Sequence, residues 1–91
     1  MGCVPLDSIQ AGIKNGICKI NVDSDSRMAM TAAIRKVFTE TPDKIDPRDY
    51  LGPARDLMTK ILSEKIEKFR SKGHAQDYKC ATLEEAKAWY K

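Results

Sequence analysis

The chain has 91 residues, with 16 Lys and Arg against 13 Asp and Glu and a net charge of +3. A chain of this length has room for one small domain, which buries roughly 60 to 65% of the surface that its unfolded chain exposes, so we expect a modest core. The charges are mixed and include no run of five like charges, so nothing in the composition calls for nucleic acid, and we expect none as a partner.

Cysteine usage and hydropathy point to a soluble, cytoplasmic protein. The three cysteines are far apart and form no Cys-x-x-Cys motif, which argues against a disulfide framework or a structural zinc site; they are Cys3, Cys18 and Cys80. No apolar run approaches the roughly 18 residues of a membrane span, and the first residues lack a basic region followed by an apolar core. We therefore expect reduced thiols and no membrane partner.

The first predicted elements are a short helix and a strand. Pro5 suits the first turn of a helix with Leu6, Ile9 and Ile13 on one face, and Asn15-Gly16 ends it. The strand that follows alternates between two faces: Cys18, Ile20 and Val22 point one way, and Lys19, Asn21 and Asp23 the other. It is the one convincing strand in the chain, and its backbone has no partner strand within the 91 residues. Either the strand prediction is wrong or these residues belong to a larger sheet.

The strand gives way within two residues to a helix, for which Asp25 or Ser26 is the expected N-cap. Free backbone N–H groups would then lie beside Asn21, Asp23 and Ser24, the outline of a phosphate site at a strand tip. The simpler interpretation is an edge strand with one solvated face, followed by an ordinary helix cap. Arg27, in the first turn of this helix, fits a nearby anion but is equally compatible with a solvated surface arginine.

Three helices and one short helix or turn are predicted from Ser26 onward. The helix from Ser26 to about Phe38 is stopped by Thr41-Pro42, and its apolar stripe comprises Met30, Ala33, Ile34, Val37 and Phe38. Asp46-Pro47 opens a short helix or turn through Leu51 that Gly52 closes, and Pro53 begins the longest helix, to about Ser71, with Gly73 as its cap. The longest helix has a stripe of Ala54, Leu57, Met58, Ile61, Leu62, Ile66 and Phe69. The last helix opens with a capping box, Thr82 to Glu85, and carries Leu83, Ala86, Trp89 and Tyr90 as a docking face.

The stretch from Gly16 to Ala54 resembles the C-terminal part of class II, zinc-dependent fructose-bisphosphate aldolases. It includes Gly-Ile-Cys-Lys-Ile-Asn-Val-Asp-Ser-Asp-Ser-Arg-Met and Asp-Pro-Arg-Asp-Tyr-Leu-Gly-Pro-Ala, and the closing Leu-Glu-Glu-Ala-Lys-Ala-Trp-Tyr is similar too. The resemblance covers nearly all of this sequence but roughly the last third of such an enzyme. It implies an α/β fold: the terminal strand-helix unit and extra helices of a (β/α)8 TIM barrel, mostly α when taken alone.

The same resemblance divides the chain, as a single segment 1–91, into three parts. Residues 1–16 correspond to a helix and turn, 17–38 to the last barrel strand and helix, and 39–91 to C-terminal helices. The expected partners are the rest of the barrel, a sugar bisphosphate and a second copy in a homodimer. The implied activity is the glycolytic and gluconeogenic one, reversible cleavage of fructose 1,6-bisphosphate into dihydroxyacetone phosphate and glyceraldehyde 3-phosphate. The choice between fructose and tagatose bisphosphates depends on stereochemistry that other parts of the substrate site determine.

Five residues are candidates for substrate binding through this resemblance. Asn21 and Asp23, with Ser24 where the family often has Thr, match an Asn-x-Asp-Thr stretch that binds dihydroxyacetone phosphate. Arg27 and Arg48 match arginines that hold the other phosphate, and one of the two is a candidate to reach a neighbouring subunit. Bidentate Arg-phosphate pairing is the chemistry that such positions offer.

The catalytic groups of the family have no counterpart in this sequence. The family uses zinc held by three histidines and an aspartate that moves a proton, whereas the single histidine, His74, matches none of the ligands. The glycine-rich phosphate loop is absent too. We therefore expect no catalytic or metal-ligating residue here, zinc bound by residues outside these 91, and no cleavage by this chain alone.

Two interpretations from other classes remain open. The first is an independent helical module that binds a partner protein through the stripe from Ala54 to Phe69 and catalyses nothing. The second, weaker one is a basic helical nucleic-acid binder, for which deep salt dependence of duplex DNA binding would be the evidence.

Overall fold

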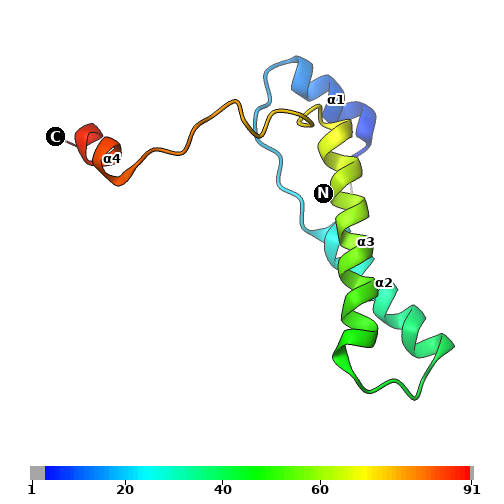
Figure 1. The fold of residues 1–91 in the computed structure, drawn as a ribbon. Helices are drawn as coiled ribbons and strands as arrows, with labels where there is room; N and C mark the ends of the chain where they lie inside the picture. Colours follow the sequence, from blue (N-terminus) through cyan, green and yellow to red (C-terminus); the bar gives the residue numbers. More distant parts are fainter. Residues whose placement is uncertain (1–3, 91) are drawn as a thin grey trace.

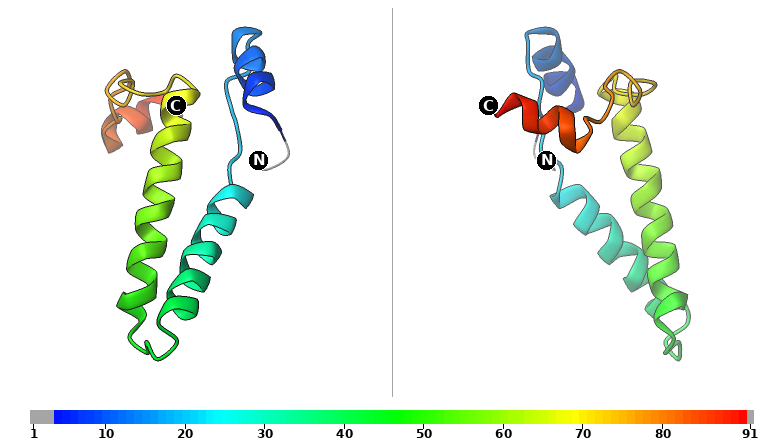
Figure 2. Two further views of the ribbon diagram at one scale, coloured as in Figure 1. Left: turned by 90° about the vertical axis from the view of Figure 1, so that its right-hand side faces the viewer. Right: turned by 60° about the vertical axis from the view of Figure 1, so that its left-hand side comes forward.

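Two antiparallel helices form the body of the protein in the computed structural model, which describes residues 4–90 (Figure 1). The element order is α1 (Leu6–Lys14), α2 (Ser24–Glu40), α3 (Pro47–Lys68) and α4 (Leu83–Trp89). Helices α2 and α3 pack on each other (Figure 2), whereas α4 stands apart at the end of a long connection (Figure 1). The radius of gyration is 18.6 Å, against about 12 Å for a typical domain of this length. The chain is therefore mostly helical and open.

The strand predicted around Cys18 to Val22 is the main correction. Residues 17–23 connect α1 to α2 without regular structure, and no strand occurs anywhere in residues 4–90. A strand is stable only when its N–H and C=O groups pair with a neighbouring strand, and this part of the protein offers none. The alternating sequence is therefore present without the sheet that it would need.

Helix α2 begins two residues earlier than expected. Asp23, not Asp25 or Ser26, is its N-cap, and the Arg27 amide donates to the Asp23 carbonyl at 3.0 Å. Its last residue is Glu40, two residues beyond the expected Phe38, and Thr41 is its C-cap, as the Thr41-Pro42 stop predicts. The earlier start moves Ser24 into the first helical position.

Helix α3 is one continuous helix where a short helix and a long one were expected. Asp46 caps it through its side chain, which accepts from the Arg48 amide at 3.0 Å, and Pro47 occupies the first turn as predicted. Gly52 and Pro53 then lie inside the helix instead of dividing it. Because Gly52 has no Cβ, the usual clash between a proline ring and the preceding side chain is relieved, and the helix continues.

The end of α3 also departs from the prediction of Ser71 and Gly73. The helix ends at Lys68, and Arg70 adopts the left-handed conformation with φ of +62°. The Ser71 amide donates to the Ile66 carbonyl and the Arg70 amide to the Glu67 carbonyl, the paired bonds of a Schellman motif. Gly73, with φ of +83°, turns the loop that follows.

The core between α2 and α3 is built from small side chains. The buried residues are Ala29 and Ala33 of α2, Ala54 of α3 and the polar Ser26. The larger members of the predicted stripes, such as Ile34, Val37 and Ile61, are only half-buried. The rings of Phe38 and Tyr50 pack in a tilted arrangement with centroids 4.9 Å apart, which fixes the end of α2 against the start of α3.

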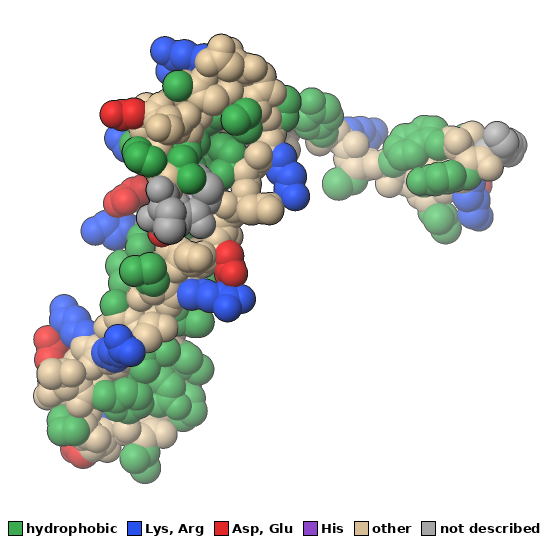
Figure 3. Space-filling model, turned by 180° about the vertical axis from the view of Figure 1, so that it is seen from behind, with side chains coloured by type: hydrophobic (Ala, Val, Ile, Leu, Met, Phe, Trp, Pro, Cys, Tyr) green, Lys and Arg blue, Asp and Glu red, His purple; other side chains and the backbone are tan. Residues whose placement is uncertain are grey.

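Large apolar side chains remain on the surface (Figure 3). On α4, the Thr82–Glu85 capping box forms as predicted, but Leu83 is 69% exposed and Trp89 is 70% exposed. No helix in the described part of the chain is long and apolar enough to cross a membrane. Cys18 and Cys80 are free thiols on the surface, while Cys3 lies outside the described residues.

Candidate functional site

Four of the five predicted site residues lie together at the start of α2. Asn21 is exposed on the segment that leads into the helix, Asp23 is the N-cap and Ser24 is the first helical residue. Arg27 follows one turn later, and its Nε lies 3.0 Å from the Asp23 Oδ1. Because residues four apart share one face of a helix, the Asp23 carboxylate orients the Arg27 guanidinium toward the helix start.

The backbone at this helix start is open to an acceptor. The first amide that bonds within the helix is that of Arg27, so the amides of Ser24, Asp25 and Ser26 have no partner one turn earlier. The Asp23 side chain makes no capping hydrogen bond, because it is engaged with Arg27. Three N–H groups, a hydroxyl and a guanidinium therefore surround the start of α2, an arrangement that suits phosphate oxygens.

Asp25 is tied to α3 by an ion pair that sequence reasoning missed. Its Oδ2 accepts from Lys65 Nζ at 2.7 Å, and both side chains are largely covered. The hydrogen bond from Lys65 holds the pKa of Asp25 below its usual value, against the opposing effect of burial. The sequence marks Asp25 only as a possible cap, and nothing local links it to a lysine 40 positions later.

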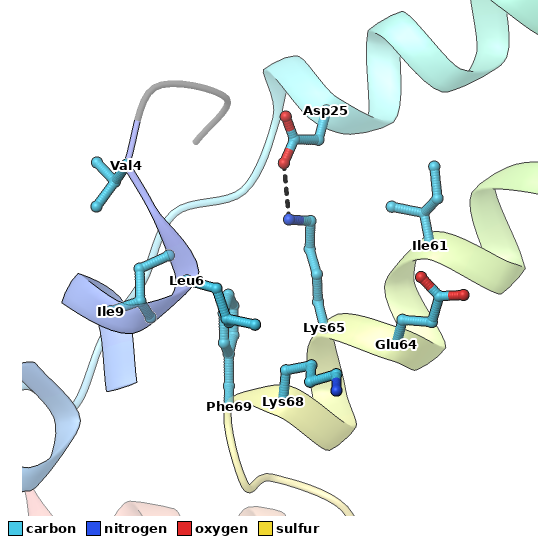
Figure 4. Close-up of a pocket in the computed structure, with 9 residues that line it drawn as sticks. All are labelled: Val4, Leu6, Ile9, Asp25, Ile61, Glu64, Lys65, Lys68 and Phe69. Carbon is cyan, nitrogen blue, oxygen red and sulfur yellow. Dashed lines mark hydrogen bonds and ion pairs between the residues drawn. The ribbon is translucent and has the colours of Figure 1, made fainter. Parts of the chain in front are cut away.

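A groove of about 330 Å³ lies beside this ion pair (Figure 4). Its apolar wall comes from α1 and the end of α3, and charged side chains close the side toward α2. The lining residues are Val4, Leu6, Ile9, Asp25, Ile61, Glu64, Lys65, Lys68 and Phe69. None of the five predicted site residues is among them, but Asp25, in the first turn of α2, lines the groove and links it to the start of that helix.

Arg48 lies at the opposite end of the helix pair. It sits in the first turn of α3, next to the end of α2, and the α2 helix rises about 20 Å between its start and Phe38. Its guanidinium pairs with Asp46, with Nη2 to Oδ2 at 2.6 Å. This pairing lowers the pKa of Asp46 and raises that of Arg48. Within one chain, therefore, Arg48 does not join the other four residues.

The described residues do not fit the zinc site that the resemblance implies for such enzymes. No group of three or more His, Cys, Asp or Glu side chains comes together within residues 4–90. The single histidine, His74, lies in an exposed loop with its Nδ1 2.7 Å from the Asp77 Oδ2. A zinc ion held by three histidines has no counterpart in this part of the chain.

The sequence matches known aldolases over most of its length. Residues 2–74 match the family model described as fructose-bisphosphate aldolase class-II. A fructose-bisphosphate aldolase of Giardia intestinalis is 68% identical over 88 residues, which are 97% of this chain and 27% of the relative. One from Nostoc commune is 40% identical over 96% of this chain and 24% of its own length, and a fructose-bisphosphate aldolase 2 from Rhodobacter capsulatus is 37% identical over 90% of this chain and 72% of its own. The chain thus spans about a quarter of the length of the first two relatives.

Proposed function

Because the chain belongs to the class II fructose-bisphosphate aldolase family, we propose that it supplies part of the substrate site for reversible cleavage of fructose 1,6-bisphosphate. The products are dihydroxyacetone phosphate and glyceraldehyde 3-phosphate. The observation that carries the proposal is the grouping of Asn21, Asp23, Ser24 and Arg27 around open amides at the start of α2. The fructose substrate and the roles below extend the family assignment.

Each of these groups has a distinct chemical task in the proposal. The Asn21 amide hydrogen-bonds a hydroxyl or carbonyl of the substrate. The Ser24 hydroxyl and the first amides of α2 bind the phosphate of the dihydroxyacetone half. Asp23 would repel a phosphate, so its task is to orient Arg27 and to accept from a substrate hydroxyl. Arg27 binds the other phosphate as a charge-assisted donor.

The proposed context is an assembled TIM barrel. Residues 17–38 would form its last strand and helix, with residues 18–22 pairing to a neighbouring strand that these 91 residues do not provide. Residues 39–91 would then be helices outside the barrel. Substrate binding at the C-terminal end of a barrel strand, next to a helix start, is the general pattern of this fold.

In this arrangement Arg48 serves a second copy of the chain. It lies at the far end of the helix pair from Arg27, yet both arginines are proposed for the same phosphate. A two-fold dimer brings the start of α3 from one subunit to the start of α2 of the other. The site would therefore be shared between subunits, and a homodimer would be the active form.

No catalytic residue is assigned to this chain. Aldol cleavage requires an electrophile at the carbonyl and a base, and in the family zinc and an aspartate supply them. The residues described here hold, orient and charge-balance the substrate. We propose that the 91 residues alone do not cleave fructose 1,6-bisphosphate.

The test uses a chimera in which residues 1–91 replace the matching part of the Giardia intestinalis relative, whose 68% identity favours correct assembly. Arg27→Ala and Arg48→Ala should each raise the KM for fructose 1,6-bisphosphate, by about 10-fold to 100-fold, because a hydrogen bond to a charged group contributes about 1.5–3 kcal/mol. Arg35→Ala, two turns further along α2, is the matched control. An unchanged KM in Arg27→Ala would contradict the proposal.

Mixing the two variants tests the shared site. In a mixed dimer, the site that retains Arg27 receives an intact Arg48 from its partner, and the other site loses both. Statistical mixing should therefore restore about a quarter of the unmodified activity under conditions where each variant alone is impaired. Additive activities without restoration would show that Arg48 acts within its own subunit.

A further inference from the structure

Asp25 places a carboxylate in the turn that is proposed to bind phosphate. It lies between Ser24 and Ser26, whose amides are among the open donors at the start of α2. An acidic side chain in the first turn favours the helix itself, because it faces the positive end of the helix dipole. A phosphate dianion at the same position is repelled by it, since two negative charges a few ångströms apart oppose each other strongly near a protein surface.

Lys65 is placed to cancel that charge. It extends from α3 to Asp25 (Figure 4), and its Nζ lies 2.7 Å from the Asp25 Oδ2. The Lys65 and Asp25 side chains are 22% and 28% exposed, respectively. By contrast, the Arg55–Asp56 pair on the same helix is more than 70% exposed on both sides. The Lys65 ammonium also lies 5.9 Å from the centre of the Phe69 ring, which supports its position.

The other charged groups at this place do not perform the same task. Glu64 and Lys68 line the same groove from α3, but the ion pair recorded for Asp25 is with Lys65. This pair also joins two helices across 40 residues of sequence, so it fixes the first turn of α2 against α3.

We infer that Lys65 is a positioning residue of the proposed phosphate site: it neutralises Asp25 and holds the carboxylate toward α3, so that the start of α2 accepts a phosphate dianion. The inference rests on the proposed function, because it concerns the same site. Lys65 does not touch the substrate. It acts on the affinity for phosphate through Asp25.

The experiment compares three variants in the chimera with the Giardia intestinalis relative. Lys65→Met leaves Asp25 charged and unpaired, and it should raise the KM for fructose 1,6-bisphosphate about tenfold, corresponding to about 1.4 kcal/mol, with a smaller change in kcat. The double variant Asp25→Asn with Lys65→Met removes the unpaired charge and should restore the KM. Lys65→Arg keeps the pair and should behave like the unmodified chimera.

Lys68→Met is the matched control, since it removes a lysine from the same groove without leaving Asp25 unpaired. A purely structural tie would impair Lys65→Met and the double variant equally, and that result would overturn the inference. An unchanged KM in Lys65→Met would overturn it as well. Asp25→Asn alone, which does not depend on whether Lys65→Met folds, should bind substrate at least as tightly as the unmodified chimera, and a tenfold higher KM would count against the inference.

The same series separates this inference from the proposed function. If Arg27→Ala leaves the KM unchanged, the proposed function fails, and the role of Lys65 fails with it because it rests on that function. If Arg27→Ala raises the KM while the Lys65 variants have no effect, only the role of Lys65 is refuted.

Discussion

Residues 1–91 on their own, at low concentration and with reduced thiols, are expected not to unfold cooperatively. Under these conditions no other protein surface covers the chain. The chain exposes 7777 Å², whereas a folded monomer of its mass, 10.2 kDa, exposes about 5300 Å². The difference, about 2500 Å², exceeds the total surface that a protein–protein interface of standard size buries.

Burying that area would contribute a large free energy. If about half of it is apolar, burial at about 25 cal/mol per Å² would contribute about 30 kcal/mol of gross stabilisation, which the isolated chain lacks. The buried apolar residues of the described chain are three alanines, Ala29, Ala33 and Ala54. A core of three alanines does not make up for the apolar surface that stays exposed.

Two-dimensional amide NMR and urea unfolding followed by circular dichroism test this expectation. Broad, poorly dispersed peaks and a shallow transition are the expected results. Sharp, dispersed peaks together with a steep transition would show that the 91 residues fold cooperatively on their own. They would also favour the alternative of an independent helical module that binds a partner through the α3 stripe.

Two further predictions concern the stability of the chimera. Arg70→Gly should raise the free energy of unfolding by about 1 kcal/mol, because Arg70 holds a left-handed φ of +62° that costs a residue with a Cβ about that much; a lower thermal midpoint would contradict this. Lys65 holds the pKa of Asp25 below its ordinary 3.8, so the ionised pair stabilises the fold above that pH and the stabilisation is lost as the pH falls through the lowered pKa. The difference in thermal midpoint between the unmodified chimera and Asp25→Asn should accordingly be largest near neutral pH and vanish in acid, and a difference independent of pH would argue against the pair.

Local signals predicted some helix ends and missed others. Asp46-Pro47 opens α3 and the Thr82–Glu85 box opens α4, because each cap is made by residues within three positions of one another. Thr41 likewise ends α2. The predicted end of α3 was wrong. Gly73 was expected to cap the helix, but the residue that adopts the left-handed conformation at its end is Arg70.

Features that depend on distant residues were not predictable in the same way. Residues 18–22 have the alternation of a strand, but a strand also needs neighbouring strands to pair with, and the alternation of one segment does not supply them. The Asp25–Lys65 pair links two helices, and no spacing rule connects positions 40 apart. The candidate site is intermediate: the grouping of Asn21, Asp23, Ser24 and Arg27 follows from their closeness in sequence, whereas the separation of Arg48 emerged only from the helix packing.

The exposed indole of α4 gives the protein a built-in optical reporter. Trp89 is the single tryptophan in the sequence, and it is 70% exposed. Indole emission shifts to shorter wavelength when water is excluded from the ring. Emission at the wavelength of tryptophan in water therefore signals a solvated α4, and a shift to shorter wavelength signals that another surface has covered Trp89. Fluorescence at nanomolar to micromolar concentration can therefore follow the burial of this helix without a label.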